Sequence, residues 1–437
     1  MNWAPLPSHA RADVVDVADP AVLLGEDGAA EQVLAGGLRW IEAQLEWFEP
    51  ARWEEFLPRR PFRPGPLLEL LGLVRVLDRV GVLSKEAPLA RGALDLAVRV
   101  AADPSFEAGL RRADEYFPYH LNLIGLLELL GRPQPTGRAV CEALLAADAG
   151  AHAQPYKPVL NRLELRYFAD RGGFPAPASL PGPGALLAES IAGLDPDVLQ
   201  LSESEVYALT HVVFYATDFG RHSLTLAADE ATGRLRETVR VLLGVHLARG
   251  SLDLLAELLL CTAALEESPG PRTGHLPCAG WNALARAARP DGALPSPVHR
   301  PEVLAGLSDA KAAAYVFGTC YHTTTAAVLA AAVRRQRGEV GQGSDADTPA
   351  ADGAQPLPCA APHAIRTWAR EVSTTARTAP AAVRDAWTDH LDPLLALCVQ
   401  ARDPGLLAEV LYAAEHLGRA GHPTPRRAAA LLAAWGI

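Results

Sequence analysis

The sequence has little lysine, little methionine and no surplus of positive charge. Only three of its 437 residues are lysine and one is methionine, and 40 Lys+Arg stand against 51 Asp+Glu, for a net charge of −11. Such a chain lacks the basic face that neutralises phosphates, so neither nucleic acid nor an anionic membrane surface is an expected partner. Abundant alanine and arginine beside so little lysine indicate a GC-rich bacterial genome.

Segments that target a protein or span a membrane are also missing. The first 21 residues are interrupted by prolines and aspartates and hold no basic stretch followed by an apolar run, which argues against a signal peptide. The longest mostly apolar runs, near 67–77 and 326–333, fall short of the roughly 18 residues that a bilayer requires. We therefore expect a cytoplasmic protein with no membrane partner.

The six cysteines do not form metal-binding pairs. No two of them are spaced as CxxC, and a structural zinc site needs closely spaced thiolates. Most lie in apolar helical surroundings, which is typical of reduced cysteines buried as small hydrophobic residues. No metal and no cofactor is expected.

Apolar residues recur at three- and four-residue steps almost throughout, and no run alternates as a half-buried strand would. The fold class is therefore all-α. The segment 67–82 is apolar on most faces, which predicts an inner helix. The predicted helices cover 31–48, 67–82, 93–100, 121–130, 137–147, 158–169, 184–191, 202–217, 234–248, 252–265, 281–288, 309–334, 363–377, 381–400, 406–417 and 425–435.

Composition divides the chain into four parts within one continuous body. We expect residues 1–25 to form an extended N-terminal arm and residues 26–337 to form the main helical body. Residues 338–362 are rich in Gly, Ser, Asp, Pro and Ala, which predicts a flexible loop or linker. Residues 363–437 predict C-terminal helices that pack on the same body.

Two interhelical turns carry a resemblance to a known architecture. Residues 170–175 (DRGGFP) and 289–295 (RPDGALP) join helices through an acidic-glycine turn that ends in an apolar residue and proline. These turns resemble those of α/α-toroid proteins, of the terpene-cyclase-like and prenyltransferase-like kind. The resemblance implies an α/α toroid, and a curved array of helical hairpins is the alternative. The aspartate-rich motifs of terpene enzymes are missing, which speaks against a terpene-cyclase reaction.

One polar stripe stands out on the helix predicted over 202–217. Tyr207, His211, Tyr215 and Asp218 follow at steps of four, four and three, and Thr217 lies beside them. Polar groups on the buried side of a helix need partners or a wet cavity. The stripe is therefore either a satisfied core network or the wall of a pocket.

Three further clusters are candidate site elements. A small polar island, Thr319, Tyr321 and His322, interrupts an Ala/Val helix and forms either a helix junction or a facing wall of the same pocket. Glu164 and Arg166 belong either to a solvated face or to a substrate contact, and His120 to an interhelical aromatic contact or a pocket rim.

These residues predict a biosynthetic enzyme that performs cyclisation, elimination or isomerisation on a small, partly apolar molecule. His211 is the expected acid/base, with Asp218, Tyr215 and His322 as further catalytic residues, because histidine titrates near neutral pH. Substrate-binding roles are expected for Tyr207, Thr217, Tyr321, Thr319, Glu164, Arg166 and His120. The segments 204–222 and 319–325 are similar to uncharacterised helical proteins from actinobacterial biosynthetic gene clusters.

Two other functions are compatible with the sequence. The first is a non-enzymatic helical scaffold for a protein or peptide, and the Trp-rich, acidic segment 40–56 is a candidate surface for such a partner or for a homodimer. The second is a non-haem iron oxygenase that uses His211, His322 and Asp218. The seven-residue step from His211 to Asp218, about 10 Å along a helix, fits such a metal triad poorly.

Overall fold

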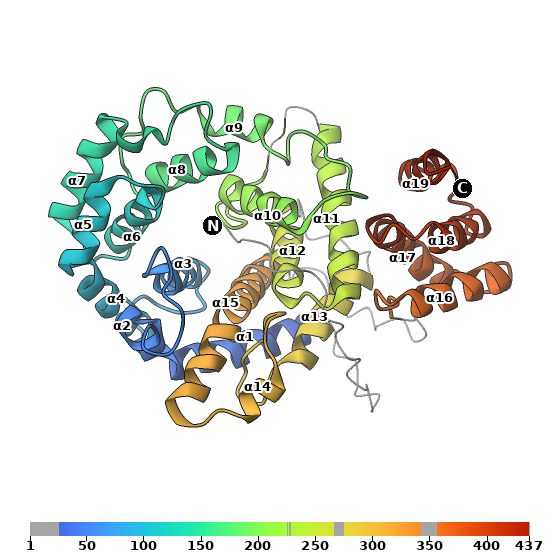
Figure 1. Cartoon of the computed structure of the whole chain (residues 1–437), viewed down its shortest axis with the longest axis horizontal. Helices are drawn as coiled ribbons and strands as arrows, with labels where there is room; N and C mark the ends of the chain where they lie inside the picture. Colours follow the sequence, from blue (N-terminus) through green and yellow to red (C-terminus); the bar gives the residue numbers. More distant parts are fainter. Residues whose placement is uncertain (1–25, 225, 227–228, 266–274, 342–355, 437) are drawn as a thin grey trace.

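The computed structural model describes residues 26–224, 226, 229–265, 275–341 and 356–436. In these ranges it contains 19 α-helices, two short 3-10 helices and no strand, which confirms the all-α class (Figure 1). The predicted N-terminal arm, residues 1–25, lies outside the described residues, as does 342–355 within the predicted linker.

Six helices follow one another around the inside of the main body (Figure 1). Each contacts the next along the chain, and the last contacts the first, so we call them the inner ring. The helix predicted to be internal belongs to it and buries leucines on most of its faces. The inner ring consists of α3 (Gly65–Arg79), α6 (Phe117–Leu129), α8 (Val159–Arg171), α10 (Glu203–Thr217), α12 (Leu252–Leu265) and α15 (Asp309–Gly341).

An outer layer packs against this ring. For example, α4 contacts α3 and α6, α9 contacts α8 and α10, and α11 contacts α12. Outside the ring lie α1 (Glu26–Ala43), α2 (Pro50–Trp53), α4 (Pro88–Ala101), α5 (Pro104–Arg112), α7 (Pro135–Ala146), α9 (Pro183–Glu189), α11 (Asp229–Arg249), α13 (His275–Ala287) and α14 (Pro301–Ala305), with 3-10 helices at Leu45–Phe48 and Ala149–Ala151. The helices α2 and α14, of four and five residues, were not predicted because they span too few turns to show a period, and the nine-residue α5 was also missed.

The C-terminal helices extend the same apolar core. They are α16 (Pro362–Thr375), α17 (Ala381–Gln400), α18 (Pro404–His416) and α19 (Pro423–Ala434). The helix α17 packs on α11 and α13, and one continuous cluster of buried apolar side chains runs from α1 to α19. The predicted linker begins later than expected, since α15 continues to Gly341.

One segment of α15, Asp309–Arg337, is long and apolar enough to cross a membrane by length and composition. In the fold, 72% of its apolar window is buried against other helices. A core helix of a globular protein has the same properties, so this segment does not decide between the two environments.

Local sequence explains several helix ends. Ser202 and Glu205 form the predicted capping box of α10, in which each side chain bonds the other residue's backbone N–H. All six cysteines are free, and four are buried as predicted, whereas Cys359 is exposed in the non-helical stretch before α16.

Candidate functional site

The inner helices leave one face of their side chains incompletely buried. On α3, α8, α10 and α15, half-buried residues recur at steps of three and four, which is the period of one helix face. These residues are Glu69, Gly72 and Arg75 on α3, Glu164, Tyr167 and Arg171 on α8, Tyr207, His211 and Tyr215 on α10, and His322, Ala326 and Leu329 on α15. Several of them bond to one another across the ring, so they face a common interior.

His322 lies between two carboxylates that come from other helices. Its Nδ1 is 2.9 Å from Glu69 Oε2 on α3, and its Nε2 is 3.7 Å from Glu257 Oε1 on α12. Burial disfavours charge on this ring, but Glu69 and Glu257 outweigh it and hold the pKa of His322 well above the usual value. Because 37% of the side chain stays accessible, the structure presents an imidazolium to the interior.

Glu257 is the shared partner of both histidines. It is almost fully buried and accepts a hydrogen bond of 2.6 Å from the Thr210 hydroxyl. Burial tends to raise its pKa, yet His211, His322 and Thr210 together lower it. An ionised carboxylate is therefore fixed behind the two rings.

His211 makes its closest polar contact with a backbone carbonyl and not with a carboxylate. Its Nδ1 lies 2.8 Å from the Tyr207 carbonyl oxygen, and because a carbonyl can only accept, Nδ1 is the protonated nitrogen. In the neutral form of this ring Nε2 carries the lone pair, and 33% of the side chain is accessible. In that form His211 can accept a proton from the interior, whereas His322 is a donor.

A third carboxylate borders the histidines. Tyr215 donates a 2.8 Å hydrogen bond to Glu164, and the His211 and Tyr215 rings lie 6.0 Å apart at their centroids. Burial raises the pKa of Glu164, although the Tyr215 hydroxyl acts against this shift. Tyr119 also interacts with Glu164, which closes this side of the interior with two phenols.

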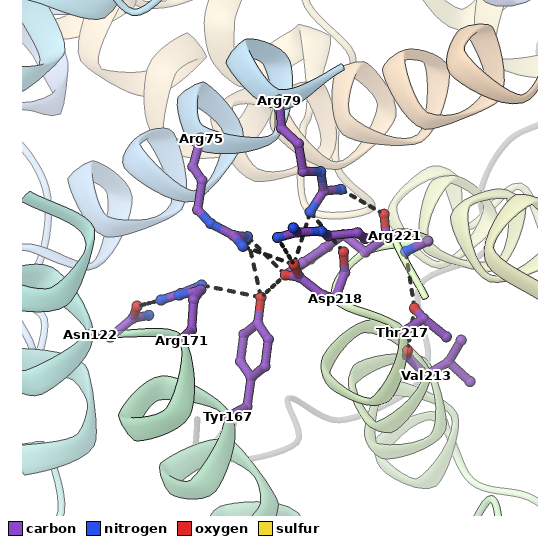
Figure 2. A network of polar contacts seen from close by, with 11 residues as sticks. Arg75, Arg79, Asn122, Tyr167, Arg171, Val213, Thr217, Asp218 and Arg221 are labelled. Carbon is purple, nitrogen blue, oxygen red and sulfur yellow. Dashed lines mark hydrogen bonds and ion pairs between the residues drawn. The ribbon is translucent and has the colours of Figure 1, made fainter. Parts of the chain in front are cut away.

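Asp218 is bound by arginines and does not pair with His211. Arg75 holds both of its carboxylate oxygens at 2.8 Å, Arg79 approaches at 3.2 Å, and Tyr167 donates to it at 2.5 Å (Figure 2). Burial would raise the pKa of Asp218, but these partners lower it. The expected assistance of His211 by Asp218 is replaced by Glu257, because α10 ends at Thr217 and Asp218 adopts a left-handed backbone, φ 46°.

The other predicted site residues lie in separate environments. Thr217 is fully buried and donates to the Val213 carbonyl, and the Thr319 hydroxyl donates to the Tyr315 carbonyl and contacts His299. Arg166 pairs with Asp170 one turn later, and His120 is buried against Phe62 and Phe106 with Nδ1 on the Tyr116 carbonyl. Tyr207 bonds Asp253, and Tyr321 accepts from Arg60 at 2.5 Å. Of the predicted residues, His211, His322, Tyr215, Tyr207 and Glu164 share the inward face or its edge.

The Trp-rich segment is packed inward. Trp40, Trp47, Phe48 and Trp53 are buried, so a partner at this surface would meet mainly the exposed glutamates.

Within the described residues, no three His, Cys, Asp or Glu side chains are grouped as metal ligands. The His211, His322 and Asp218 triad is accordingly not assembled, since Asp218 is occupied by arginines.

Sequence reasoning missed the two carboxylates that define the site. Glu69 and Glu257 each interrupt a strongly apolar segment, PLLELLG on α3 and LLAELLL on α12. A charge buried in such a segment is costly unless it is paired. The apolar surroundings of the two glutamates therefore indicated that each of them needs a partner. The same argument applies to Arg75 on α3.

Comparisons with known proteins give a family without an assigned activity. No curated protein matches the chain, and no solved structure matches it. The profile of a family described as "Domain of unknown function (DUF6895)" matches residues 34–332, a range that contains five inner helices entirely and most of α15, and ends before α16. Because this match covers more than half of the chain, the protein belongs to the DUF6895 family.

Proposed function

We propose that this protein is a cytoplasmic enzyme that transfers protons on a small, partly apolar molecule held inside the inner ring. We further infer that the ring is an α/α toroid, because six sequential inner helices contact in closed order and an outer layer covers them. Binding sites of small molecules are concave, mostly apolar, and fitted with a few convergent polar groups.

One observation carries the proposal: two half-buried histidines border the same buried carboxylate, Glu257, with His211 held through Nδ1 by a backbone carbonyl and His322 held as a cation by Glu69 and Glu257. His211 Nε2 can accept a proton from a carbon or a hydroxyl of the substrate. The His322 imidazolium, held by Glu69 and Glu257, can donate a proton or stabilise a developing negative charge. Removing a proton at one atom and returning one at another is an isomerisation, and protonation of a leaving group completes an elimination.

The rest of the interior suits a partly apolar substrate. Ala326 and Leu329 follow His322 on the inward face of α15, and the Tyr215 and Tyr167 rings stack with centroids 5.0 Å apart. Gly72 leaves open space beside them, since a Cβ added there would meet no atom within 4 Å.

The test is an activity screen with a matched inactive variant. Wild-type protein and His211→Gln would be incubated with fractionated small-molecule extract of the source cells and compared by mass spectrometry. We expect at least one compound to be converted by the wild type only, while circular dichroism and melting temperature stay unchanged in the variant. Glutamine keeps a polar side chain of similar reach but cannot act as a base at neutral pH.

The alternative is a scaffold that binds a protein or peptide. It predicts that no extract fraction is converted by the wild type and that His211→Gln retains every interaction. A large loss of stability in His211→Gln would instead make His211 a structural residue, because its Nδ1 bond to Tyr207 would then be its main contribution.

A further inference from the structure

Four arginines gather at one end of the inner ring, where three of them approach the carboxylate of Asp218 and the fourth, Arg171, bonds Tyr167. Arg75 and Arg79 lie on the last turns of α3, Arg171 ends α8, and Arg221 follows α10 (Figure 2). We call these four residues the arginine cluster. Arg75, Arg79 and Arg221 pair with the same carboxylate, at 2.8, 3.2 and 3.8 Å, so three guanidinium groups share Asp218 (Figure 2).

Helix ends explain part of this arrangement. The C-terminal carbonyls of a helix carry partial negative charge and favour cations. Accordingly, Arg79 donates to the carbonyl oxygens of Asp218 and Phe219, at 2.9 and 3.0 Å. Both terminal nitrogens of Arg75 bond Asp218, one of them also Tyr167, and those of Arg171 bond Tyr167 and Asn122.

Arg79 and Arg221 keep donors that this pairing does not satisfy. The Nε of Arg79 is buried and has no hydrogen-bond partner, and Arg79 as a whole keeps only 16% of its side chain accessible. Arg221 is 56% accessible and reaches Asp218 only at 3.8 Å, which is longer than a hydrogen bond. A buried donor without an acceptor is costly, and so are several like charges with one counter-charge.

The cluster is continuous with the interior that holds the histidines. Arg75 shares the half-buried face of α3 with Glu69, and Tyr167, which bonds Asp218, stacks on Tyr215. Asp218 follows His211 by seven residues and caps the end of α10, so the two residues lie about two helical turns, roughly 10 Å, apart. A molecule of modest length can therefore reach from the arginine cluster to His211.

We propose that the arginine cluster binds the anionic group, a carboxylate or a phosphate, of the molecule on which the histidines act. This inference rests on the proposed function and specifies its substrate class. Guanidinium groups bind both anions through charge-assisted hydrogen bonds, and an incoming anion would supply the acceptor that Arg79 Nε lacks and the charge that Asp218 alone does not balance.

The experiment measures binding of simple anions by isothermal titration calorimetry. The probes are inorganic phosphate, hexyl phosphate and hexanoate, with hexylammonium as the cationic control. We expect saturable binding of at least one anion and none of hexylammonium. Hexanoate binding without phosphate binding would assign a carboxylate, and the reverse would assign a phosphate.

Three variants locate the site. Arg221→Gln changes a mostly exposed side chain and should fold normally, and both it and Arg79→Gln should weaken anion binding by about ten-fold or more. Arg111→Gln removes the same charge from an exposed pair with Glu107 and should bind as the wild type does. Wild type without saturable anion binding, or folded Arg79→Gln and Arg221→Gln with unchanged affinity, would overturn the proposal.

The two proposals can fail separately. His211→Gln should lose conversion of the substrate but keep anion binding, since His211 does not touch the arginine cluster. Anion binding that survives while no extract fraction is converted would leave the arginine cluster as an anion site and remove the enzymatic proposal.

Discussion

The Nδ1 atom of His322 lies 2.9 Å from Oε2 of Glu69, although 253 residues separate them in sequence. The contact joins α15 to α3 and so closes the inner ring by a charged pair. With Glu257 on the other ring nitrogen, it makes His322 a fixed cation facing the interior.

His322 should remain doubly protonated at about pH 7.5, because its raised pKa lies well above the ordinary value near 6.5. Long-range ¹⁵N–¹H NMR of the imidazoles should show both of its nitrogens protonated, whereas the His211 Nδ1 alone carries a proton once that ring is neutral. A neutral His322 ring at this pH would contradict the assignment.

The same pKa makes stability depend on pH in a defined direction. A group whose pKa rises on folding stabilises the fold fully below its unfolded pKa, near 6.5, and loses that contribution as pH rises through the folded value. The melting temperature of the wild type should fall on the alkaline side. His322→Gln should start lower and show a flatter profile, and an equal slope in both proteins would refute the linkage.

Filling the interior should abolish function without unfolding the protein. Gly72 faces open space on the inward side of α3, and Gly233 faces open space on the outer helix α11. Gly72→Leu and Gly233→Leu should each leave stability unchanged or raise it by up to about 1 kcal/mol, because glycine is unfavourable within helices.

Of the two, only Gly72→Leu should lose conversion of the substrate identified by the extract screen. Chemical denaturation and the same mass-spectrometric assay measure both effects. Equal activity in the two variants would mean that the interior beside Gly72 is not the site.

Asp218 should be a stabilising residue. Replacing it with Asn leaves Arg75 and Arg79 without their carboxylate in a mostly buried setting, and removing one partner of a buried pair costs about 3 kcal/mol. Glu107→Gln breaks only the exposed pair with Arg111 and should cost below about 1 kcal/mol. Urea titration compares the two, and a loss for Asp218→Asn no larger than for Glu107→Gln would disprove the role.

Gly292 should resist any side chain. Its φ is +94°, and an added Cβ would lie 2.2 Å from the carbonyl oxygen of Gly36, a backbone atom of α1 that cannot rotate away. Gly292→Ala should therefore destabilise the fold by roughly 3 kcal/mol.

Gly81→Ala is the matched control for this clash. It has a similar positive φ of 74° but open space, so it should cost only about 1 kcal/mol. Equal losses in the two variants would show that backbone strain alone, and not the contact with α1, requires glycine at Gly292.

The periodicity of the sequence was enough to predict most of the helices and one shared face. Tyr207, His211 and Tyr215 lie at four-residue steps and are half-buried on one side of α10, as the spacing predicts. Asp218 belongs to the predicted stripe only if the helix continues through it. In the structure the chain leaves the helix after Thr217, and Asp218 adopts a left-handed backbone. A helical period carries no information about the residue at which the backbone stops following it.

What the sequence determined by itself is therefore the all-α class and the stripe of α10, because apolar spacing and helix caps act over a few residues. The acidic balance of the whole chain does not describe the inner helices and the turn after α10, which carry the arginine cluster as well as Glu69, Glu164 and Glu257. Only the tertiary structure placed Glu257 behind His211 and His322 and moved Asp218 to the arginines. These pairings depend on which helices meet across the ring, and long-range packing decides that.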